Sequence, residues 1–194
     1  MIAPMRPEHV DRVAELHCAT LTGLLSELGA PAARAFYSGC LRSGSAVGFV
    51  HLRQDEVCGF VLGSVHPDQL KRAVFRGDPA GVLAGTLLGV LKRPAALARL
   101  LKSFRGPDEG GFDPRAPELT YLSVAADRRK DGIGGGLVDA FTRAMRDAAV
   151  PAYELSVDDA NAGAIAFYEG RGFQPIGRYR EFGAEHRRYR LRIA

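Results

Sequence analysis

The chain has 194 residues, of which 46% are hydrophobic and 25% are charged, with a formal net charge of +4. This length and composition predict one soluble domain, residues 1–194, with a sizeable core. The polar residues 5–9 and the shortness of the longest nearly apolar run, residues 82–91, argue against a signal peptide and a membrane span. Cys18, Cys40 and Cys58 are odd in number and lack metal-ligand spacing. We therefore expect free thiols, no metal site and a cytoplasmic location.

The N-terminal part predicts a strand, two helices and a hairpin. Residues 2–5 have the pattern of a strand, and residues 7–29 that of a helix, because apolar residues recur at helical spacing from Val10 to His17. Residues 31–41 predict a second, shorter helix. Residues 46–52 and 57–65 predict a hairpin around a polar turn, and strict alternation places three side chains of its second strand on one face: Cys58, Phe60 and Leu62.

The segment from residue 66 to residue 117 is too long for a structureless loop inside a compact domain. Apolar residues recur at helical spacing in residues 84–91 and again in residues 97–104, which predicts two helices followed by a glycine-rich link at residues 106–111. Residues 70–105 contain eight Lys and Arg residues and one acidic residue, Asp78. Four interpretations stay open: a solvated basic face over buried leucines, recruitment of an anionic ligand, dimerisation through the apolar stripes, or contact with a membrane surface. We expect no nucleic-acid partner, because aromatic platforms are missing.

A glycine-rich turn follows the predicted strand at residues 119–124 and leads into a helix. Its sequence is Arg129-Lys130-Asp131-Gly132-Ile133-Gly134-Gly135-Gly136. Glycines let the backbone approach a ligand, and a helix N-terminus offers unpaired N–H groups, so the turn predicts a diphosphate site. A P-loop would end in Gly-Lys-Ser/Thr, and a Rossmann turn would need glycine where Leu137 stands. What remains is the pattern Arg-x-x-Gly-x-Gly.

A second motif follows the predicted strand at residues 153–157. Asn161, Ala164 and Tyr168 are spaced to share one helix face, and Gly172-Phe173 comes after them. A purely structural interpretation is also available, in which Asn161 caps the helix, Tyr168 is half-buried and Gly172 ends the helix. The hairpin of residues 173–182 and 187–193 completes the chain.

The two motifs, in this order and at this distance, resemble the acyl-CoA signature of the GNAT N-acetyltransferase superfamily. The resemblance covers the chain except for residues 66–117. It implies an α/β (α+β) fold with a mixed central sheet of about seven strands flanked by helices, and a helical insertion between the third and fourth strands. It also implies acetyl-CoA as co-substrate, held by Leu122, Val124, Arg129, Lys130, Asp131, Gly132, Ile133, Gly134, Gly135, Asn161 and Tyr168.

The resemblance further implies direct attack of a primary amine on the thioester, without a covalent acyl-enzyme. A bulge in the fourth strand would free the N–H of Leu122 for the thioester oxygen, and Tyr168 would assist the departing sulfur. The family often has a glutamate where this chain has Thr120, so we expect Glu118, two residues earlier, to act as the general base through water. Glu154 and His186 are weaker candidates.

The resulting expectation is an acetyl-CoA-dependent N-acetyltransferase of a small-molecule amine. The basic insertion favours an acceptor that carries a carboxylate or phosphate. Two alternatives remain open: a protein or peptide N-acetyltransferase, and a non-catalytic acyl-CoA-binding regulatory module. The sequence also leaves open a homodimer and an acyl group longer than acetyl.

Overall fold

The computed structural model describes residues 1–77, 79–92, 113, 115–181 and 183–193. Their strands form one sheet in the order β1-β2-β3-β4-β5-β7-β6. All neighbouring strands are antiparallel except β4 and β5, which are parallel. The mixed seven-stranded sheet expected from the sequence is therefore confirmed. The strands are β1 (Ile2–Pro4), β2 (Ala46–Arg53), β3 (Glu56–Ser64), β4 (Glu118–Val124), β5 (Ala152–Asp158), β6 (Gln174–Glu181) and β7 (Ala184–Arg192).

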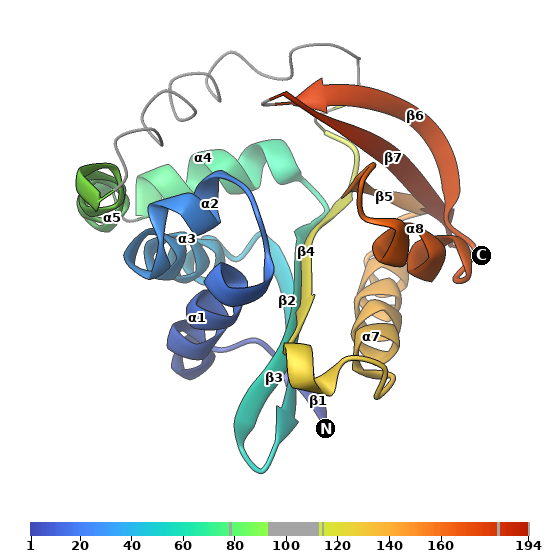
Figure 1. Cartoon of the computed structure of the whole chain (residues 1–194), viewed down its shortest axis with the longest axis horizontal. Coiled ribbons are helices and arrows are strands. Elements are labelled where there is room, and N and C mark those ends of the chain that lie inside the picture. The colour runs from blue at the N-terminus through green and yellow to red at the C-terminus, as the bar shows by residue number, and fades with distance from the viewer. Residues whose placement is uncertain (78, 93–112, 114, 182, 194) are drawn as a thin grey trace.

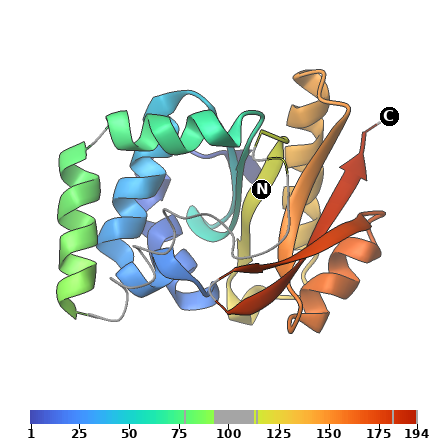
Figure 2. The same ribbon diagram turned by 90° about the horizontal axis from the view of Figure 1, so that it is seen from above.

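Helices cover both faces of the sheet (Figures 1 and 2). On one side lie η1 (Pro7–His9), α1 (Val10–Thr20), α2 (Leu24–Leu28), α3 (Ala30–Ser43), α4 (Pro67–Gly77) and α5 (Pro79–Lys92). On the other side lie α7 (Ile133–Asp147), which follows the short turn η2 (Ala126–Arg128), and α8 (Ala162–Glu169). Each side has its own buried apolar cluster against the sheet, and burial of this kind is the main stabilising term of such a fold.

The first helical segment is shorter than the sequence pattern predicts. The buried stripe from Val10 to His17 is confirmed, but α1 ends at Thr20. Leu21 is extended, with φ −105° and ψ 151°, and Gly23 has a φ of +112°, a conformation that side chains rarely allow. The prediction of one helix through residue 29 is therefore wrong, and the helix restarts as α2.

The prediction that Cys58 shares a face with Phe60 and Leu62 is also wrong. The β2–β3 register shifts so that His51 faces Gly59 and Leu52 faces Val57, which leaves Cys58 as an extra residue in β3. A bulge of this type breaks the two-residue alternation. Cys58 consequently packs on the α7 side of the sheet, while Phe60 and Leu62 pack on the α1 side.

The insertion between β3 and β4 is helical, as predicted, but its pattern differs in detail. Helix α4 was not predicted, and its Leu70 and Val74 are buried against the α1 side of the sheet. The predicted helix at residues 84–91 is part of α5, and the one at residues 97–104 lies outside the described residues. None of the described helices is long and apolar enough to cross a membrane.

Helix α5 contacts α3 through its small residues rather than through its leucines. A Cβ on Gly85 would come within 2.9 Å of the Cα of Ala32, so glycine is what permits the close approach. The opposite face carries Leu83, Leu87 and Leu91, which are 70%, 56% and 69% exposed. Within the described residues, the interpretation of the α5 stripe as buried leucines is therefore wrong.

Candidate active site

Strands β4 and β5 separate almost as soon as they meet. Their parallel pairing is confined to one register pair, Glu118 with Glu154, supported by the Glu154 amide bonding to the carbonyl of Pro117 at 2.8 Å. Beyond Glu118, β4 continues to Val124 in pairing with β3 alone among the described strands. Beyond Glu118, the edge of β4 that faces β5 therefore has no ladder partner in the described part of the chain.

The amides of Leu122 and Val124 point toward this separation. In an antiparallel ladder, alternate residues direct their N–H and C=O groups to opposite sides. The Ala125 amide bonds to the Cys58 carbonyl at 2.9 Å, so Ser123 and Tyr121 face β3 as well. Leu122 and Val124 lie between these positions and therefore face away from β3.

A bulge in β4 precedes these two residues. Leu62 pairs with Tyr121 and Gly63 pairs with Leu119, which leaves Thr120 as the extra residue. The bulge confirms that the fourth strand is irregular near Leu122. It also removes the regular alternation that would place Glu118 and Thr120 on one face. Gly63 accommodates the bulge, because a Cβ there would overlap the carbonyl oxygen of Glu118.

The glycine turn opens α7 as the sequence predicts. Lys130 and Gly132 have φ values of +72° and +76°, and Gly132 is the N-cap of the helix. The first bond within the helix runs from the Gly136 amide to the Gly132 carbonyl at 3.1 Å. The amides of residues 133–135 therefore have no carbonyl acceptor within the helix and remain available for an anion. Arg129, Lys130 and Asp131, the side chains that precede this helix end, are all exposed.

Three elements converge at Gly134. A Cβ on this residue would lie 3.7 Å from a side-chain carbon of Val124 and 3.6 Å from the ring of Phe167. The end of β4, the first turn of α7 and α8 are thus in contact at one point. Arg171 reinforces the packing of α8 on α7 through an ion pair with Asp139 and lies 5.7 Å above the Phe167 ring.

Both structural roles considered for Asn161 and Gly172 are present. The Asn161 side chain accepts a hydrogen bond from the Ala164 amide at 3.0 Å and so caps α8. Beyond Gly170, the chain turns at Gly172, with a φ of +85°, and the amide of Phe173 bonds to the carbonyl of Tyr168 at 3.1 Å. This is the bonding of a Schellman turn. The contact of Asn161 with a cofactor stays a prediction.

Tyr168 packs inside the cluster between the sheet and α7 and α8. Its ring lies 5.0 Å from that of Phe167 and 5.3 Å from that of Phe173, and the residue is 7% exposed. Burial raises the pKa of Tyr168 well above its ordinary value of 10. The hydroxyl therefore keeps its proton at neutral pH.

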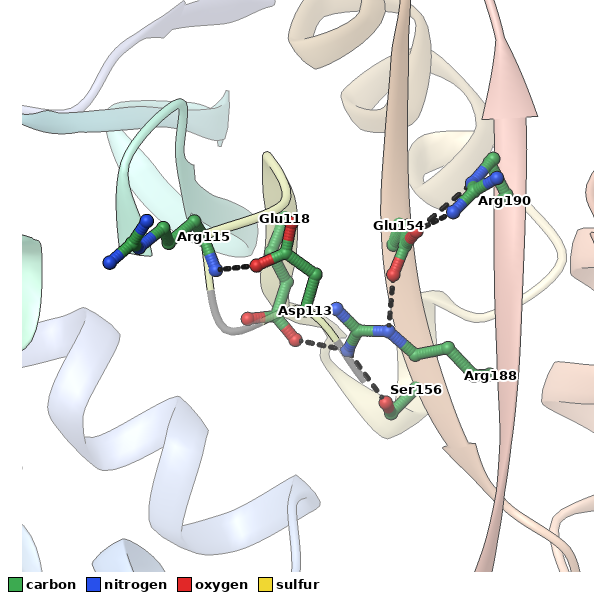
Figure 3. A network of polar contacts seen from close by, with 7 residues as sticks. All are labelled: Asp113, Arg115, Glu118, Glu154, Ser156, Arg188 and Arg190. Carbon is green, nitrogen blue, oxygen red and sulfur yellow. Dashed lines mark hydrogen bonds and ion pairs between the residues drawn. The ribbon is translucent and has the colours of Figure 1, made fainter. Parts of the chain in front are cut away.

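Glu118 does not stand alone at the start of β4. Its Oε1 accepts a hydrogen bond from Nη1 of Arg188 at 2.7 Å, and Nε of Arg188 donates to Glu154 at 2.8 Å (Figure 3). Glu154 also accepts hydrogen bonds from Arg190 and is 3% exposed as a residue. Glu154 is therefore paired within the sheet. The third candidate base, His186, is stacked on Tyr179 at 5.2 Å.

Three residues of this network were not predicted as site residues: Arg188, Arg190 and Ser156, whose hydroxyl accepts a hydrogen bond from Arg188 at 2.9 Å. A signal was present, since Arg188 and Arg190 alternate with the buried Tyr189 on β7. Alternation places two arginines on one face of a strand. It does not say which neighbouring strand brings carboxylates to them.

The parted strands β4 and β5 thus lie beside the glycine turn that opens α7. The family model described as Acetyltransferase (GNAT) family matches residues 10–173, and the chain belongs to this family. The resemblance seen in the sequence is therefore confirmed. A mycothiol acetyltransferase from Propionibacterium freudenreichii subsp. shermanii is 36% identical over 104 residues, which cover 51% of this chain and 29% of that protein.

Solved structures support the same fold. One, described as an acetyltransferase, superposes with a TM-score of 0.67 at 18% identity and full coverage of both chains. The ribosomal-protein-S18-alanine N-acetyltransferase from Escherichia coli gives a TM-score of 0.60 at 14% identity, with 100% of this chain and 94% of that chain covered. At these identities the likeness establishes the fold alone.

The residues present fit an acyl-CoA. The amides of residues 133–135 suit a diphosphate, and the outward amides of Leu122 and Val124 suit an extended amide-containing arm running along β4. Within the described ranges, no group of three or more His, Cys, Asp and Glu side chains is placed to hold a metal ion.

Proposed function

We propose that the protein is an acetyl-CoA-dependent N-acetyltransferase, formed by residues 1–194 as one domain, that transfers an acetyl group to a primary amine of a small molecule. The observation that carries the proposal is the direction of the Leu122 and Val124 amides, which face the separation of β4 and β5 next to the open end of α7. Family membership supports acyl transfer. The curated relative is named for mycothiol rather than for a protein, which favours a small acceptor.

In this proposal the cofactor site consists mainly of backbone. The amides of residues 133–135 bind the pyrophosphate, with the side chains of residues 129–131 around it. Val124 pairs with the pantetheine arm, and Asn161 touches it. The Leu122 N–H donates to the thioester oxygen, where negative charge develops during attack.

Two protons must move. The attacking nitrogen gives up a proton, which Glu118 accepts through a water, and the departing sulfur takes one from the Tyr168 hydroxyl. Binding both substrates in one ternary complex supplies the proximity of nitrogen and carbonyl. No covalent acyl-enzyme at Cys58 is involved. The protein would work in the cytoplasm, with its three cysteines as free thiols.

The experiment is a thiol-release assay with acetyl-CoA and a panel of small amines, peptides and longer acyl-CoA thioesters. Release that depends on a small amine supports the proposal. Release that depends on a peptide N-terminus or on lysine instead supports the protein acetyltransferase alternative. Tight acyl-CoA binding by calorimetry without release across the panel would identify a non-catalytic acyl-CoA-binding module.

We further propose that the insertion, residues 66–117, selects an acceptor carrying a carboxylate or phosphate. Its excess of basic residues supports this, together with its position, because it leads directly into β4 at Glu118. A variant with glutamine at four basic positions should raise KM for the acceptor and flatten its salt dependence, with KM for acetyl-CoA unchanged. The positions are Lys92, Arg93, Arg99 and Lys102. Unchanged acceptor kinetics would contradict this part of the proposal.

A homodimer stays a separate prediction. The exposed face of α5 carries Leu83, Leu87 and Leu91, and an apolar helix face of this kind is suited to association. Light scattering tests it directly. A dimer that becomes monomeric when Leu83 and Leu87 are replaced by glutamine supports association through α5, whereas a monomeric wild-type protein contradicts it.

A further inference from the structure

One side chain of β7 spans the point where β4 and β5 part. Arg188 has a side chain that is only 4% exposed, and its guanidinium donates to Glu118 on β4 and to Glu154 and Ser156 on β5 (Figure 3). The three bonds measure 2.7, 2.8 and 2.9 Å. Arg188 therefore connects three strands at the beginning of the separation along which Leu122 and Val124 lie.

The guanidinium separates two carboxylates that the sheet brings together. Glu118 and Glu154 are partners in register on neighbouring strands, and like charges so placed repel each other. Burial by itself would lower the pKa of Arg188, but the two carboxylates outweigh burial and raise that pKa above its ordinary value. Arg188 therefore stays charged, and its guanidinium is paired with both carboxylates.

The remaining charged groups around Glu118 come from three other positions. Arg190 on β7 bonds to Glu154, and Asp113 and Arg115 lie on the segment that leads into β4 (Figure 3). Arg115 contributes its backbone amide to Asp113 at 2.9 Å. Among the described side chains, Arg188 is the one that bonds directly to the Glu118 carboxylate.

The bond to Arg188 fixes Glu118 without burying it. The Glu118 side chain is 18% exposed, so it can accept a further hydrogen bond from water or from a ligand, whereas that of Glu154 is 4% exposed and holds two arginines. A planar guanidinium with several donors in fixed directions orients a carboxylate more strictly than a flexible ammonium does.

We propose that Arg188 is a positioning residue for the reaction: it holds the Glu118 carboxylate in a fixed orientation at the closed end of the β4–β5 separation, where Glu118 takes up the proton of the acceptor amine. This inference rests on the proposed function. Arg188 does not contact the reacting atoms. It acts through Glu118, whose remaining hydrogen-bonding capacity serves the relay water.

The test compares Arg188→Met and Arg188→Lys with Arg180→Gln, which removes a positive charge from the same hairpin at an exposed pair with Glu185. The readout is kcat and KM for the amine, measured separately. In Arg188→Met kcat should fall by about 10- to 100-fold with KM for the amine little changed, because the Glu118 carboxylate is no longer held in one orientation. Arg188→Lys should give an intermediate kcat, because it keeps the charge but not the three bonds. Arg180→Gln should leave both constants unchanged.

Each outcome is decisive. CoA binding by calorimetry verifies that the variants are folded, and it should be unchanged. An active, folded Arg188→Met protein with an unchanged kcat would mean that Arg188 only joins the strands, and it would overturn the inference while leaving the proposed function intact. If Arg188→Met does not fold, Arg188→Lys decides in the same way. A wild-type protein without amine-dependent thiol release overturns both the proposed function and this inference.

Discussion

The two halves of the candidate site present different groups to a ligand: backbone amides in one, charged side chains in the other. At the first turn of α7, the groups available to a ligand are backbone amides at residues 133–135, exposed by positive φ values at Lys130 and Gly132. At the start of β4, the groups are charged side chains gathered around Arg188 from three strands. A backbone site depends on local conformation, which sequence spacing reveals, whereas a side-chain network depends on the tertiary pairing of distant strands. The first half was predictable, and the second was not.

The largest expected effect is at Tyr168. Tyr168→Phe keeps the ring contacts with Phe167 and Phe173 but removes the hydroxyl that would donate to the departing sulfur. We expect kcat to fall by about 10²- to 10⁴-fold, as for the loss of a general acid. CoA affinity by calorimetry should change little. Steady-state kinetics with full kcat would mean that the sulfur leaves without this acid.

The next prediction concerns the bulge that sets the direction of β4. Gly63→Ala should destabilise the fold by about 3 kcal/mol, because the added Cβ overlaps the Glu118 carbonyl oxygen and lies 2.6 Å from the Phe141 ring. Gly177→Ala is the control, since a Cβ there has nothing within 4 Å. Urea unfolding of both variants measures the difference. Equal stabilities would show that the bulge does not need glycine opposite it.

A neutral buried pair offers a contrast to the charged network around Arg188. His17 is 1% exposed and lies 2.7 Å from the Tyr37 hydroxyl, and burial lowers the pKa of His17 from 6.5 to about 4. The unfolded chain takes up this proton near pH 6.5 and the folded protein only near pH 4. The neutral His17 therefore adds about 3 kcal/mol to the free energy of unfolding above pH 6.5, and this stabilisation is lost as the pH falls toward 4.

Urea unfolding of the wild type and of His17→Gln, between pH 7 and pH 4.5, tests this prediction. Both proteins lose stability in acid through their carboxylates, but the wild type should lose more. Parallel pH dependences would mean that His17 is not held neutral in the folded state.

If the amides of residues 133–135 bind the pyrophosphate, substitutions at Gly134 and at Arg129 should differ in their effect. Gly134→Val should weaken CoA binding by about 100-fold, the equivalent of about two charge-assisted hydrogen bonds, because its side chain occupies the space that the pyrophosphate needs. The Cβ itself meets only ordinary contacts, at 3.6–3.8 Å, so the fold should persist. Arg129→Ala removes one exposed side chain and should cost about 10-fold or less. The reverse order in calorimetry would make the side chain, not the backbone, the main ligand.

The strands and most helices followed from periodicity, because alternation and helical spacing are local signals. The break after Thr20, the bulge at Cys58 and the helix α4 did not. The first depends on Gly23 taking a positive φ, and the second on a register between β2 and β3 that alternation cannot reveal. In the site, the glycine turn, the cap at Asn161 and the irregular fourth strand were anticipated. Arg188 was missed because its partners lie 34 and 70 residues away.

The central claim, that backbone amides hold the cofactor, is most directly tested by a ¹H–¹⁵N NMR titration of the full chain with CoA. The account predicts the largest amide shifts at residues 133–135 and at Leu122 and Val124, with smaller changes around Arg188 and Arg190. Shifts concentrated on the β6–β7 hairpin, with the amides of residues 133–135 unmoved, would contradict it.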